Sequence, residues 1–320
     1  MILSEACPRW ASALICLLLA VAFVASLYVW ARATMESRDH PDVVVRRIVS
    51  VSVVSSLAPL ALLACASHQD GSPPFSAWMG LPFTTSSPLS WLAAVTLPLA
   101  VTASLFLGPI VQESLEYQSL QSWAAVGIAT LWAPSQRLLR VRNLIVGPFC
   151  EEWVFRATMC SLMYGTGWSL TPMVLVPPVL FGLAHVHHLI DMVRSRGMSL
   201  AQGAAAVVVQ LTYTTAFGVY ACFIFIRTGH FISCFLCHAF CNLMGFPDLS
   251  WVSDEKHRRH RALLIVSYVS GVIIFSVSLA PLTAPHLYGS MFSPPPVDPA
   301  YPPAPRLTVP ATTLQRLLQT

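Results

Sequence analysis

The sequence predicts an all-α protein that crosses a membrane with about eight helices. Of its 320 residues, 55% are hydrophobic and only 10% are charged, whereas an average soluble chain carries about 25% charged residues. The apolar residues gather into long runs, and a helix needs about 20 such residues to cross the hydrocarbon core of a bilayer. These observations favour one polytopic membrane body over two soluble domains.

We expect three parts along the chain. Residues 1–9 are a short N-terminal tail, residues 10–285 form a single transmembrane domain, and residues 286–320 are a C-terminal tail. Because this last tail is rich in proline, which cannot continue a helix, we expect it to be disordered. The segment Ser67–Ser90 is rich in Ser, Pro and Gly and lacks basic residues, which is typical of a lumenal loop.

The expected spans are separated by polar or basic segments. The first is longer than the roughly 7–15 apolar residues of a signal peptide, so we expect it to be retained as a helix. The fourth and seventh contain polar residues within the apolar run. The spans are Trp10–Trp30, Ile48–Ala66, Trp91–Ile110, Leu144–Met163, Thr171–Leu189, Ala204–Ile226, Phe231–Phe246 and Ala262–Leu282.

The basic residues test this count. If the spans alternate in direction, most of the 18 basic residues fall on one side of the membrane: Arg32, Arg38, Arg46, Arg47, Arg137, Arg140, Arg142, Arg194, Arg196, Lys256, Arg258, Arg259 and Arg261. Positive residues mark the cytoplasmic side, so both termini are expected on the lumenal or outer face. No basic run of the kind that binds nucleic acid is present, and we expect no nucleic-acid partner.

Span four holds three charged side chains in the run Cys150-Glu-Glu-Trp-Val-Phe-Arg156. A charge inside a span costs about 2.5–3.5 kcal/mol on insertion scales and is by default a functional candidate. On a helix, Glu152 and Arg156 lie at i and i+4 in the favourable order, which suits an ion pair that fixes helix packing. Glu151 points about 100° away from Glu152 and has no local partner. It is therefore the stronger candidate for chemistry.

Two further spans contribute polar side chains. His185 lies near the end of span five, and span seven contains His238-Ala-Phe-Cys-Asn242, whose spacing puts the imidazole and the amide on one face. At 1.5 Å per residue, Glu151 lies roughly 10 Å from the cytoplasmic end of its span. His185, His238 and Asn242 lie about one or two turns from the cytoplasmic ends of theirs. All four groups are therefore expected at comparable depth in the cytoplasmic leaflet.

A carboxylate, two imidazoles and an amide can together hydrolyse an amide or ester without a covalent intermediate. A Glu in a poorly solvated pocket can take and return protons, and one His can orient a water against it. The second His and the Asn amide can donate hydrogen bonds to a developing oxyanion.

Other chemistries share these residues. A Glu with His185 and His238 could bind zinc, although no His-Glu-x-x-His motif is present. Cys234-x-x-Cys237-His238 matches the pattern of c-type haem attachment, but it lies inside an apolar span. A cysteine nucleophile has three candidates, Cys150, Cys237 and Cys241. A non-catalytic scaffold or transporter could also bury charges, but it would not need all four polar groups. We expect neither a metal nor another cofactor.

The polar motifs resemble the signatures of the type II CAAX prenyl endopeptidases, within the wider family of CAAX proteases and bacteriocin-processing intramembrane enzymes. The matching runs are Glu151-Glu152-x-x-x-Arg156, Phe181-x-x-x-His185 and His238-x-x-x-Asn242. The likeness covers residues 140–247, about a third of the chain. His187 and His188 are additional imidazoles for which a position lining the site or behind it is expected.

The resemblance implies an activity and a setting. Such enzymes lie in the endoplasmic reticulum membrane and remove the last three residues of a Cys-a-a-X sequence whose cysteine carries a farnesyl or geranylgeranyl group; their substrates include Ras-like small GTPases. By resemblance, Glu151 and His185 activate water, His238 and Asn242 form the oxyanion hole, and Glu152 and Arg156 support them. A conical cavity among the helices, open to lipid and to the cytoplasmic side, is expected, because a prenyl group leaves the bilayer at a cost of about 0.8 kcal/mol per CH₂.

Overall fold

The computed structural model describes residues 2–3, 7–30, 38–67, 73–82, 87–117, 119, 121, 133, 136–194 and 197–292. Within these residues the protein is helical, apart from one antiparallel pair of two-residue strands, β1 (Ile2–Leu3) and β2 (Ala66–Ser67). The prediction of an all-helical, polytopic membrane fold is confirmed.

The described residues form the following helical segments. In chain order they are α1 (Arg9–Ser26), α2 (Pro41–Leu57), α3 (Leu60–Ala64), α4 (Phe75–Trp78), α5 (Pro88–Leu105), α6 (Leu107–Glu116), α8 (Arg137–Arg140), η2 (Val141–Val146), α9 (Gly147–Glu152), η3 (Trp153–Thr158), α10 (Met159–Gly165), α11 (Leu170–Ala184), η4 (His185–His187), α12 (His188–Arg194), α13 (Leu200–Thr228), α14 (Phe231–Met244), η5 (Ser250–Val252), η6 (Glu255–His260), α15 (Arg261–Leu282) and η7 (Pro285–Leu287). Of these, η2 and η3 are π-helical and η4 to η7 are 3₁₀-helical.

Six helical segments in the described part of the chain are long and apolar enough to cross a membrane. They are Arg9–Ser26, Pro41–Ala64, Pro88–Leu105, Leu170–Arg194, Leu200–Thr228 and His257–Leu282, and they overlap six of the eight expected spans. The expected fourth span is the run from α8 to α10, which alternates between α- and π-helical winding. The expected seventh is α14, with only 14 residues. The total of eight crossings stays a prediction.

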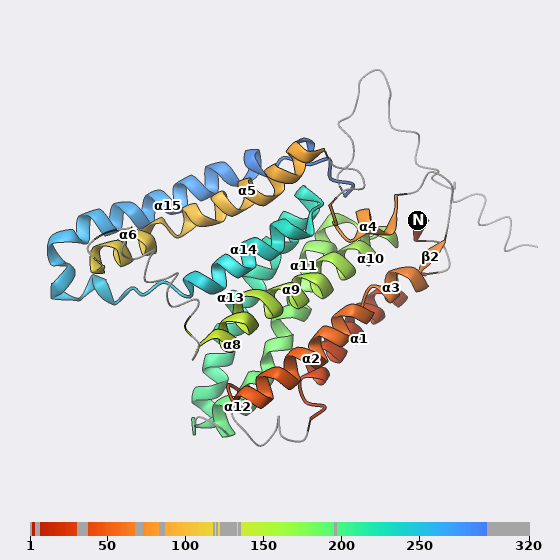
Figure 1. Ribbon diagram of the computed structural model, residues 1–320, viewed down its shortest axis with the longest axis horizontal. Helices are drawn as coiled ribbons and strands as arrows, with labels where there is room; N and C mark the ends of the chain where they lie inside the picture. The colour runs from red at the N-terminus through yellow and green to blue at the C-terminus, as the bar shows by residue number, and fades with distance from the viewer. Residues whose placement is uncertain are drawn as a thin grey trace, which may run out of the picture.

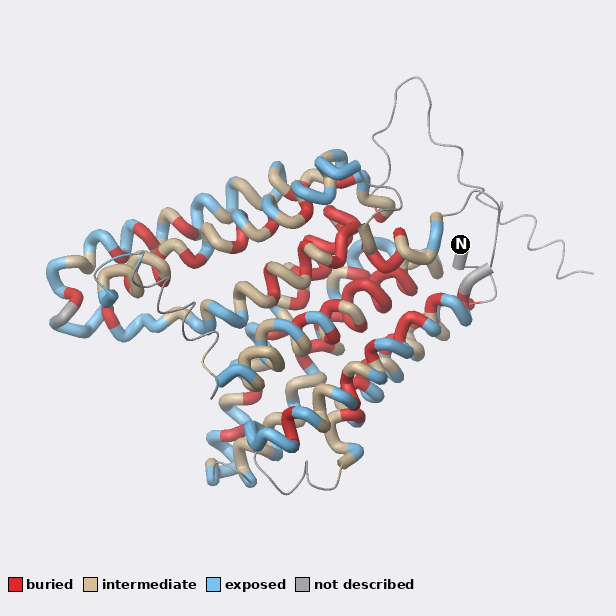
Figure 2. The backbone as a smooth tube through the Cα atoms, viewed as in Figure 1, coloured by how far each residue is buried: buried red, intermediate tan, exposed pale blue. Residues whose placement is uncertain are grey.

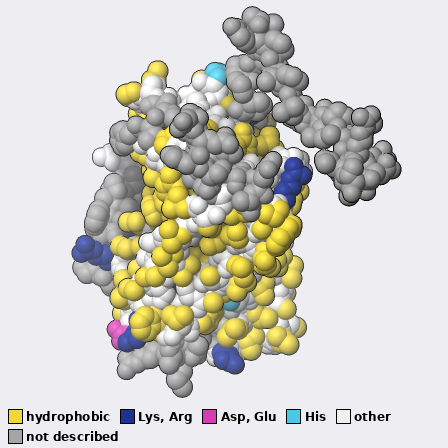
Figure 3. All heavy atoms as spheres, turned by 90° about the vertical axis from the view of Figure 1, so that its right-hand side faces the viewer, with side chains coloured by type: hydrophobic (Ala, Val, Ile, Leu, Met, Phe, Trp, Pro, Cys, Tyr) yellow, Lys and Arg dark blue, Asp and Glu magenta, His cyan; other side chains and the backbone are white. Residues whose placement is uncertain are grey.

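The helices form a layered bundle (Figure 1). Helices α5, α6 and α15 pack together on one side, α1 and α2 lie on the other, and α9, α10, α11, α13 and α14 run between them. Buried residues concentrate in this middle layer, whereas the outer helices carry long exposed stretches (Figure 2). Many of the exposed side chains are large and apolar, such as Val277 of α15 and Leu18 of α1. Figure 3 shows one face covered mostly by hydrophobic side chains, which is the surface that a lipid environment requires.

Two segments expected outside the bundle pack into it. Trp78 and Met79 lie within the expected loop Ser67–Ser90, yet both are buried in the core. Beyond α15, Tyr288 and Phe292 are also buried, and the Phe292 ring contacts Phe225 of α13. The packed chain thus continues past residue 285, where we expected the tail to begin. Residues 293–320, which hold most of that tail, lie outside the described residues.

Helix α13 has a recognisable capping motif at each of its ends. Ser199 and Gln202 form a capping box, in which each side chain accepts a hydrogen bond from the other residue's backbone N–H. At the other end, Gly229 adopts a left-handed conformation with φ of 69°, which ends the helix at little steric cost.

Gly218 allows α13 to approach α11 closely. A Cβ at this position would lie 2.9 Å from Cβ of Pro178 and 3.2 Å from Nη2 of Arg156. We predict that Gly218→Ala lowers the free energy of unfolding by about 1–3 kcal/mol through overpacking, measured by denaturant unfolding in detergent micelles.

Gly203→Ala is the matched control in the same helix. Its Cβ would meet the mobile end of Leu189, and Ala is favoured over Gly in a helix by up to about 1 kcal/mol. This variant should be neutral or stabilised. Equal destabilisation of the two variants would contradict the role given to Gly218.

Candidate active site

A fully buried ion pair lies at the centre of the bundle. The side chains of Glu152 and Arg156 have no exposed surface, and Nη1 of Arg156 donates to Oε1 of Glu152 at 2.9 Å. Cζ of Arg156 lies 4.4 Å from the ring centroid of Phe181 and 5.8 Å from that of Phe217. Both rings therefore add cation–π attraction to the ion pair. The pairing predicted from the i, i+4 spacing is confirmed.

His238 of α14 bridges the two neighbouring glutamates. Its Nδ1 lies 2.6 Å from Oε1 of Glu152, and its Nε2 lies 3.6 Å from Oε2 of Glu151. One carboxylate oxygen of Glu152 thus serves both Arg156 and His238. The ring of Phe217 packs against His238 at 4.7 Å between centroids. The imidazole is therefore fixed by a hydrogen bond to Glu152 on one edge and by an aromatic ring beside it.

The two neighbouring glutamates lie in different environments. Both residues lie in α9, between the π-helical segments η2 and η3. A π-helical turn takes in one more residue than an α-helical turn, and such turns are frequent at functional sites. Glu152 points into the closed core, whereas the Glu151 side chain keeps 23% of its surface exposed.

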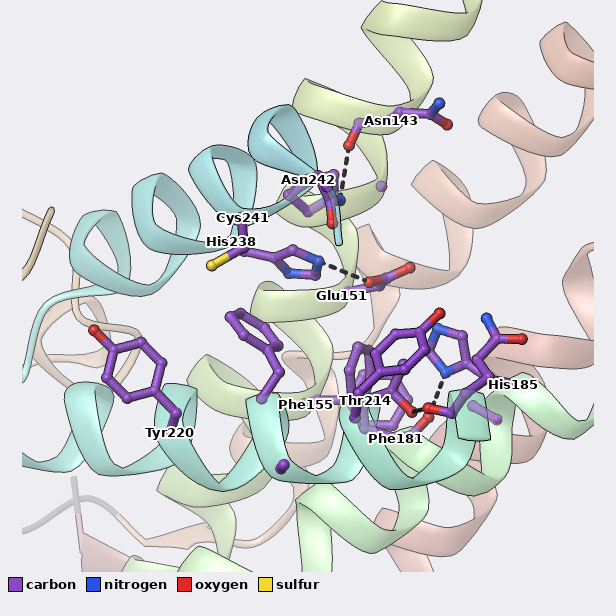
Figure 4. A pocket seen from close by; sticks show the side chains of 18 of the residues that line it. Asn143, Glu151, Phe155, Phe181, His185, Thr214, Tyr220, His238, Cys241 and Asn242 are labelled. Carbon is purple, nitrogen blue, oxygen red and sulfur yellow. Dashed lines mark hydrogen bonds and ion pairs between the residues drawn. The ribbon is translucent and has the colours of Figure 1, made fainter. Parts of the chain in front are cut away.

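Glu151, His185, His238 and Asn242 all line one cavity of about 1200 Å³. Figure 4 shows the Glu151–His238 contact in the middle of this cavity, with His185 beyond it on the side of α11. The structure therefore brings together the four side chains that the sequence singled out for chemistry. Glu152 and Arg156 lie behind the cavity wall.

Hydrogen bonds to the backbone orient His185 and Asn242. Nδ1 of His185 lies 2.8 Å from the carbonyl oxygen of Phe181. Because a carbonyl can only accept, Nδ1 carries the proton, and Nε2 of the neutral ring is an acceptor. Nδ2 of Asn242 donates to the carbonyl oxygen of Asn143 at 2.9 Å, which ties the end of α14 to η2 beside the cavity (Figure 4).

His187 and His188 also line the cavity, as expected for a position around the site. Nδ1 of His188 lies 2.9 Å from Oε1 of Gln210, and Nδ1 of His187 lies 2.5 Å from the carbonyl oxygen of Ala184. Asn143 and Gln210 were not expected in the site. Asn143 contacts Asn242, and Gln210 contacts His188. Because both partners lie far away in the sequence, no local motif could have indicated either residue.

The two ends of the cavity differ in chemistry. Phe217, Tyr220 and Phe275 line the cavity next to His238, in a series of ring contacts that begins with Phe217 against the imidazole. The part of the wall near His185 and His187 includes Arg38 and Arg47, which act electrostatically on these imidazoles, and Arg142, which donates to the carbonyl oxygen of Arg38. In Figure 4, Tyr220 and His185 lie on opposite sides of the Glu151–His238 contact. A bound molecule that spans the cavity would thus meet an apolar end and a cationic end.

Comparison with known proteins agrees with this arrangement. Residues 133–244 match the family model of the type II CAAX prenyl endopeptidases, described as Rce1-like. The chain is 40% identical over 285 residues to CAAX prenyl protease 2 of Homo sapiens, which covers 88% of this chain and 84% of that protein. This chain belongs to the type II CAAX prenyl endopeptidase family. The expectation of an enzyme, a peptidase, is confirmed, and a non-catalytic scaffold or transporter is no longer favoured.

Other members of the family match over shorter or similar lengths. CAAX prenyl protease 2 of Rattus norvegicus is 36% identical over 285 residues, with 88% of this chain and 83% of that protein covered. The protein of the same name from Arabidopsis thaliana is 32% identical over 210 residues, with 61% of this chain and 65% of that protein covered. No solved structure matches the chain.

The metal and cysteine alternatives find little support in the geometry of this endopeptidase. Among the described residues, no three His, Cys, Asp or Glu side chains come together in a way that could hold a metal ion. Cys237 is buried and takes a hydrogen bond from Oγ1 of Thr102 at 3.1 Å. Sγ of Cys234 contacts the carbonyl oxygen of Ala221, and His238 faces the two glutamates. Cys241 does line the cavity, and it is tested below.

The buried ion pair gives a stability prediction. Arg156→Met leaves the carboxylate of Glu152 without its guanidinium partner, so we expect a loss of about 3–5 kcal/mol of stability. Adding Glu152→Gln should restore part of this loss, because the uncompensated charge is removed. The measurement is unfolding in detergent micelles.

Arg258→Met is the control for the loss of an arginine. Arg258 pairs with Glu255 at 3.7 Å, but about three quarters of both side chains are exposed (77% and 76%), so this pair contributes at most about 1 kcal/mol. If Arg156→Met unfolds at the same denaturant concentration as Arg258→Met, the central ion pair does not stabilise the fold.

Proposed function

We propose that this protein removes the aaX tripeptide from prenylated CAAX proteins by direct attack of an activated water. The observation that carries the proposal is the cavity itself, in which Glu151 and His238 meet at 3.6 Å and His185 and Asn242 lie in the same wall. These are one carboxylate, two imidazoles and one amide, the groups needed for hydrolysis without a covalent intermediate.

In the proposed reaction, Glu151 is the general base. It takes a proton from a water that also donates a hydrogen bond to Nε2 of His185. This nitrogen can accept because the N–H of the ring is at Nδ1, where it donates to the carbonyl oxygen of Phe181. The water oxygen attacks the carbonyl carbon of the peptide bond that follows the prenylated cysteine. Glu151 then returns the proton to the leaving amine, and the tripeptide departs.

The oxyanion formed in this step is stabilised by His238 and Asn242. With its Nδ1–H donated to Glu152, a protonated His238 ring directs its Nε2–H toward the cavity. The contact with Glu152 fixes the orientation of the ring, so that the donor is already in place when the oxyanion forms. Nδ2 of Asn242 carries two N–H donors, and only one is needed for the carbonyl of Asn143.

The aromatic end of the cavity suits the prenyl group. A farnesyl or geranylgeranyl chain is apolar, and Phe217, Tyr220 and Phe275 offer it apolar surface beside the catalytic groups. The tripeptide then lies on the side of His185. As substrates we infer prenylated proteins such as Ras-like small GTPases, which reach the enzyme through the lipid of the membrane.

We also infer a position in the endoplasmic reticulum membrane with the active site facing the cytosol. Arg38, Arg47 and Arg142 line the cavity, and all three belong to the basic side of the sequence, which the positive-inside rule assigns to the cytoplasm. Prenyl groups are attached in the cytosol, so the substrate arrives at this face.

The catalytic assignment predicts large losses of turnover. With purified protein in detergent and a fluorogenic farnesylated peptide, Glu151→Gln should lower kcat by at least about 100-fold. His238→Asn removes an oxyanion donor and should cost about 100- to 1000-fold. The product should be identified by mass, as the released tripeptide and the peptide ending in prenylcysteine.

Cys241→Ser is the control within the cavity wall. Because the proposed mechanism uses no thiol, this variant should keep near-normal turnover, whereas its inactivation would favour a cysteine nucleophile. Near-normal turnover of Glu151→Gln would show that another group is the base. Chelator-sensitive activity that zinc restores would favour a metal-dependent reaction instead.

The orientation can be tested with glycosylation acceptors. An Asn-Gly-Thr site added after Thr320 should receive a glycan, because we place the C-terminus in the lumen. The same site in a flexible Gly/Ser linker inserted after Gly197 should receive none. The readout is a glycosidase-sensitive shift in gel mobility, and a glycan at the inserted linker would reverse the proposed orientation.

A further inference from the structure

We propose that Arg38, Arg47 and Arg142 bind the terminal carboxylate of the substrate and so set the length of the peptide that is released. The inference rests on the function proposed above. A CAAX substrate ends in a free α-carboxylate three residues beyond the bond that is cut. The part of the substrate that lies past the catalytic groups therefore carries a negative charge at a fixed distance from them.

The charges of the cavity wall match this requirement. Among the described residues that line the cavity, Glu151 is the one acidic side chain, whereas three arginines line it. Arg38 precedes α2, Arg47 lies within α2, and Arg142 belongs to η2. Guanidinium groups bind carboxylates through paired, charge-assisted hydrogen bonds. Three of them at one end of a cavity form a suitable site for a single carboxylate.

Existing contacts hold these arginines in place. Nη1 of Arg142 lies 2.9 Å from Oδ1 of Asp39, and Nε of Arg38 lies 3.7 Å from the same atom. Cζ of Arg47 lies 5.4 Å from the ring centroid of Tyr28, and Asp191 of α12 acts electrostatically on this guanidinium. Neither Asp39 nor Asp191 lines the cavity. At these arginines the cavity wall therefore presents guanidinium groups, while the carboxylates that hold them lie outside the lining.

The spacing agrees with a tripeptide. Arg142 and Glu151 lie nine positions apart in one continuous helical run, which corresponds to at most roughly 13 Å along its axis at the α-helical rise of about 1.5 Å per residue, because η2 is π-helical and therefore more compact. Three residues of extended chain span roughly 10–11 Å. With the scissile bond at Glu151, the carboxylate of a bound tripeptide thus comes within reach of the long Arg142 side chain. A shorter or longer leaving peptide would place its carboxylate away from the arginines.

The test compares two farnesylated peptides of the same sequence, one ending in a carboxylate and one in a carboxamide. For the wild-type enzyme we expect kcat/KM to be roughly 10- to 100-fold lower for the carboxamide, the range expected for the loss of a hydrogen-bonded charge. Arg47→Gln and Arg142→Gln should lower kcat/KM for the carboxylate peptide, mainly through KM, and change the carboxamide reaction little. The ratio of the two rates should therefore fall toward one.

Arg46→Gln is the matched control. Arg46 neighbours Arg47 in α2, but its guanidinium lies over the ring of Trp30 at 5.2 Å and does not line the cavity. This variant should keep the wild-type ratio. A further check is a peptide lengthened by one residue at its C-terminus, which the wild-type enzyme should cleave poorly after the prenylcysteine.

The outcomes separate this inference from the proposed function. If the wild-type enzyme cleaves both peptides equally well, or if Arg47→Gln and Arg142→Gln keep the full wild-type ratio, the carboxylate site is wrong while the endopeptidase stands. If neither peptide loses a tripeptide, the proposed function fails and this inference fails with it. A variant that does not fold would lose activity toward both peptides. In that case the wild-type comparison of the carboxylate peptide with the carboxamide peptide decides alone.

Discussion

The arrangement of the site depends on one buried carboxylate oxygen. Oε1 of Glu152 receives Arg156 at 2.9 Å and His238 at 2.6 Å, and thereby links α9 and η3 to α14. A lone charge inside the bundle would be costly, so each partner stabilises the other two. The Phe181 and Phe217 rings cover the guanidinium. The site is thus held by two polar contacts that meet at one fully buried carboxylate.

Two adjacent residues of the same type are used in different ways. Glu152 lies in the closed core and contacts His238, whereas Glu151 lines the cavity and is accessible from it. In the proposed mechanism this difference separates support from chemistry. In the proposed binding mode, the aromatic and cationic parts of the same cavity give the substrate one direction, with the prenyl group and the carboxylate at opposite ends.

The sequence was sufficient for features that depend on local spacing. The apolar runs predicted the long helices, and the i, i+4 spacing predicted the ion pair of Glu152 with Arg156. It could not predict the contact of Glu151 with His238, which comes from the packing of α14 against α9. Nor did periodicity predict the π-helical turns around α9. The burial of Phe292 was missed because a proline-rich composition says nothing about a single aromatic ring that fills a gap in the core.

The most direct test of this account is an experimental structure of the protein with a bound, non-cleavable farnesylated CAAX peptide in which a ketomethylene group replaces the scissile amide. We predict that the ketone oxygen lies within hydrogen-bond distance of Nε2 of His238, while Nδ1 stays on Glu152. The farnesyl chain should lie against Phe217 and Tyr220. A ketone bound away from both Glu151 and His238, or a His238 ring turned away from Glu152, would contradict the account.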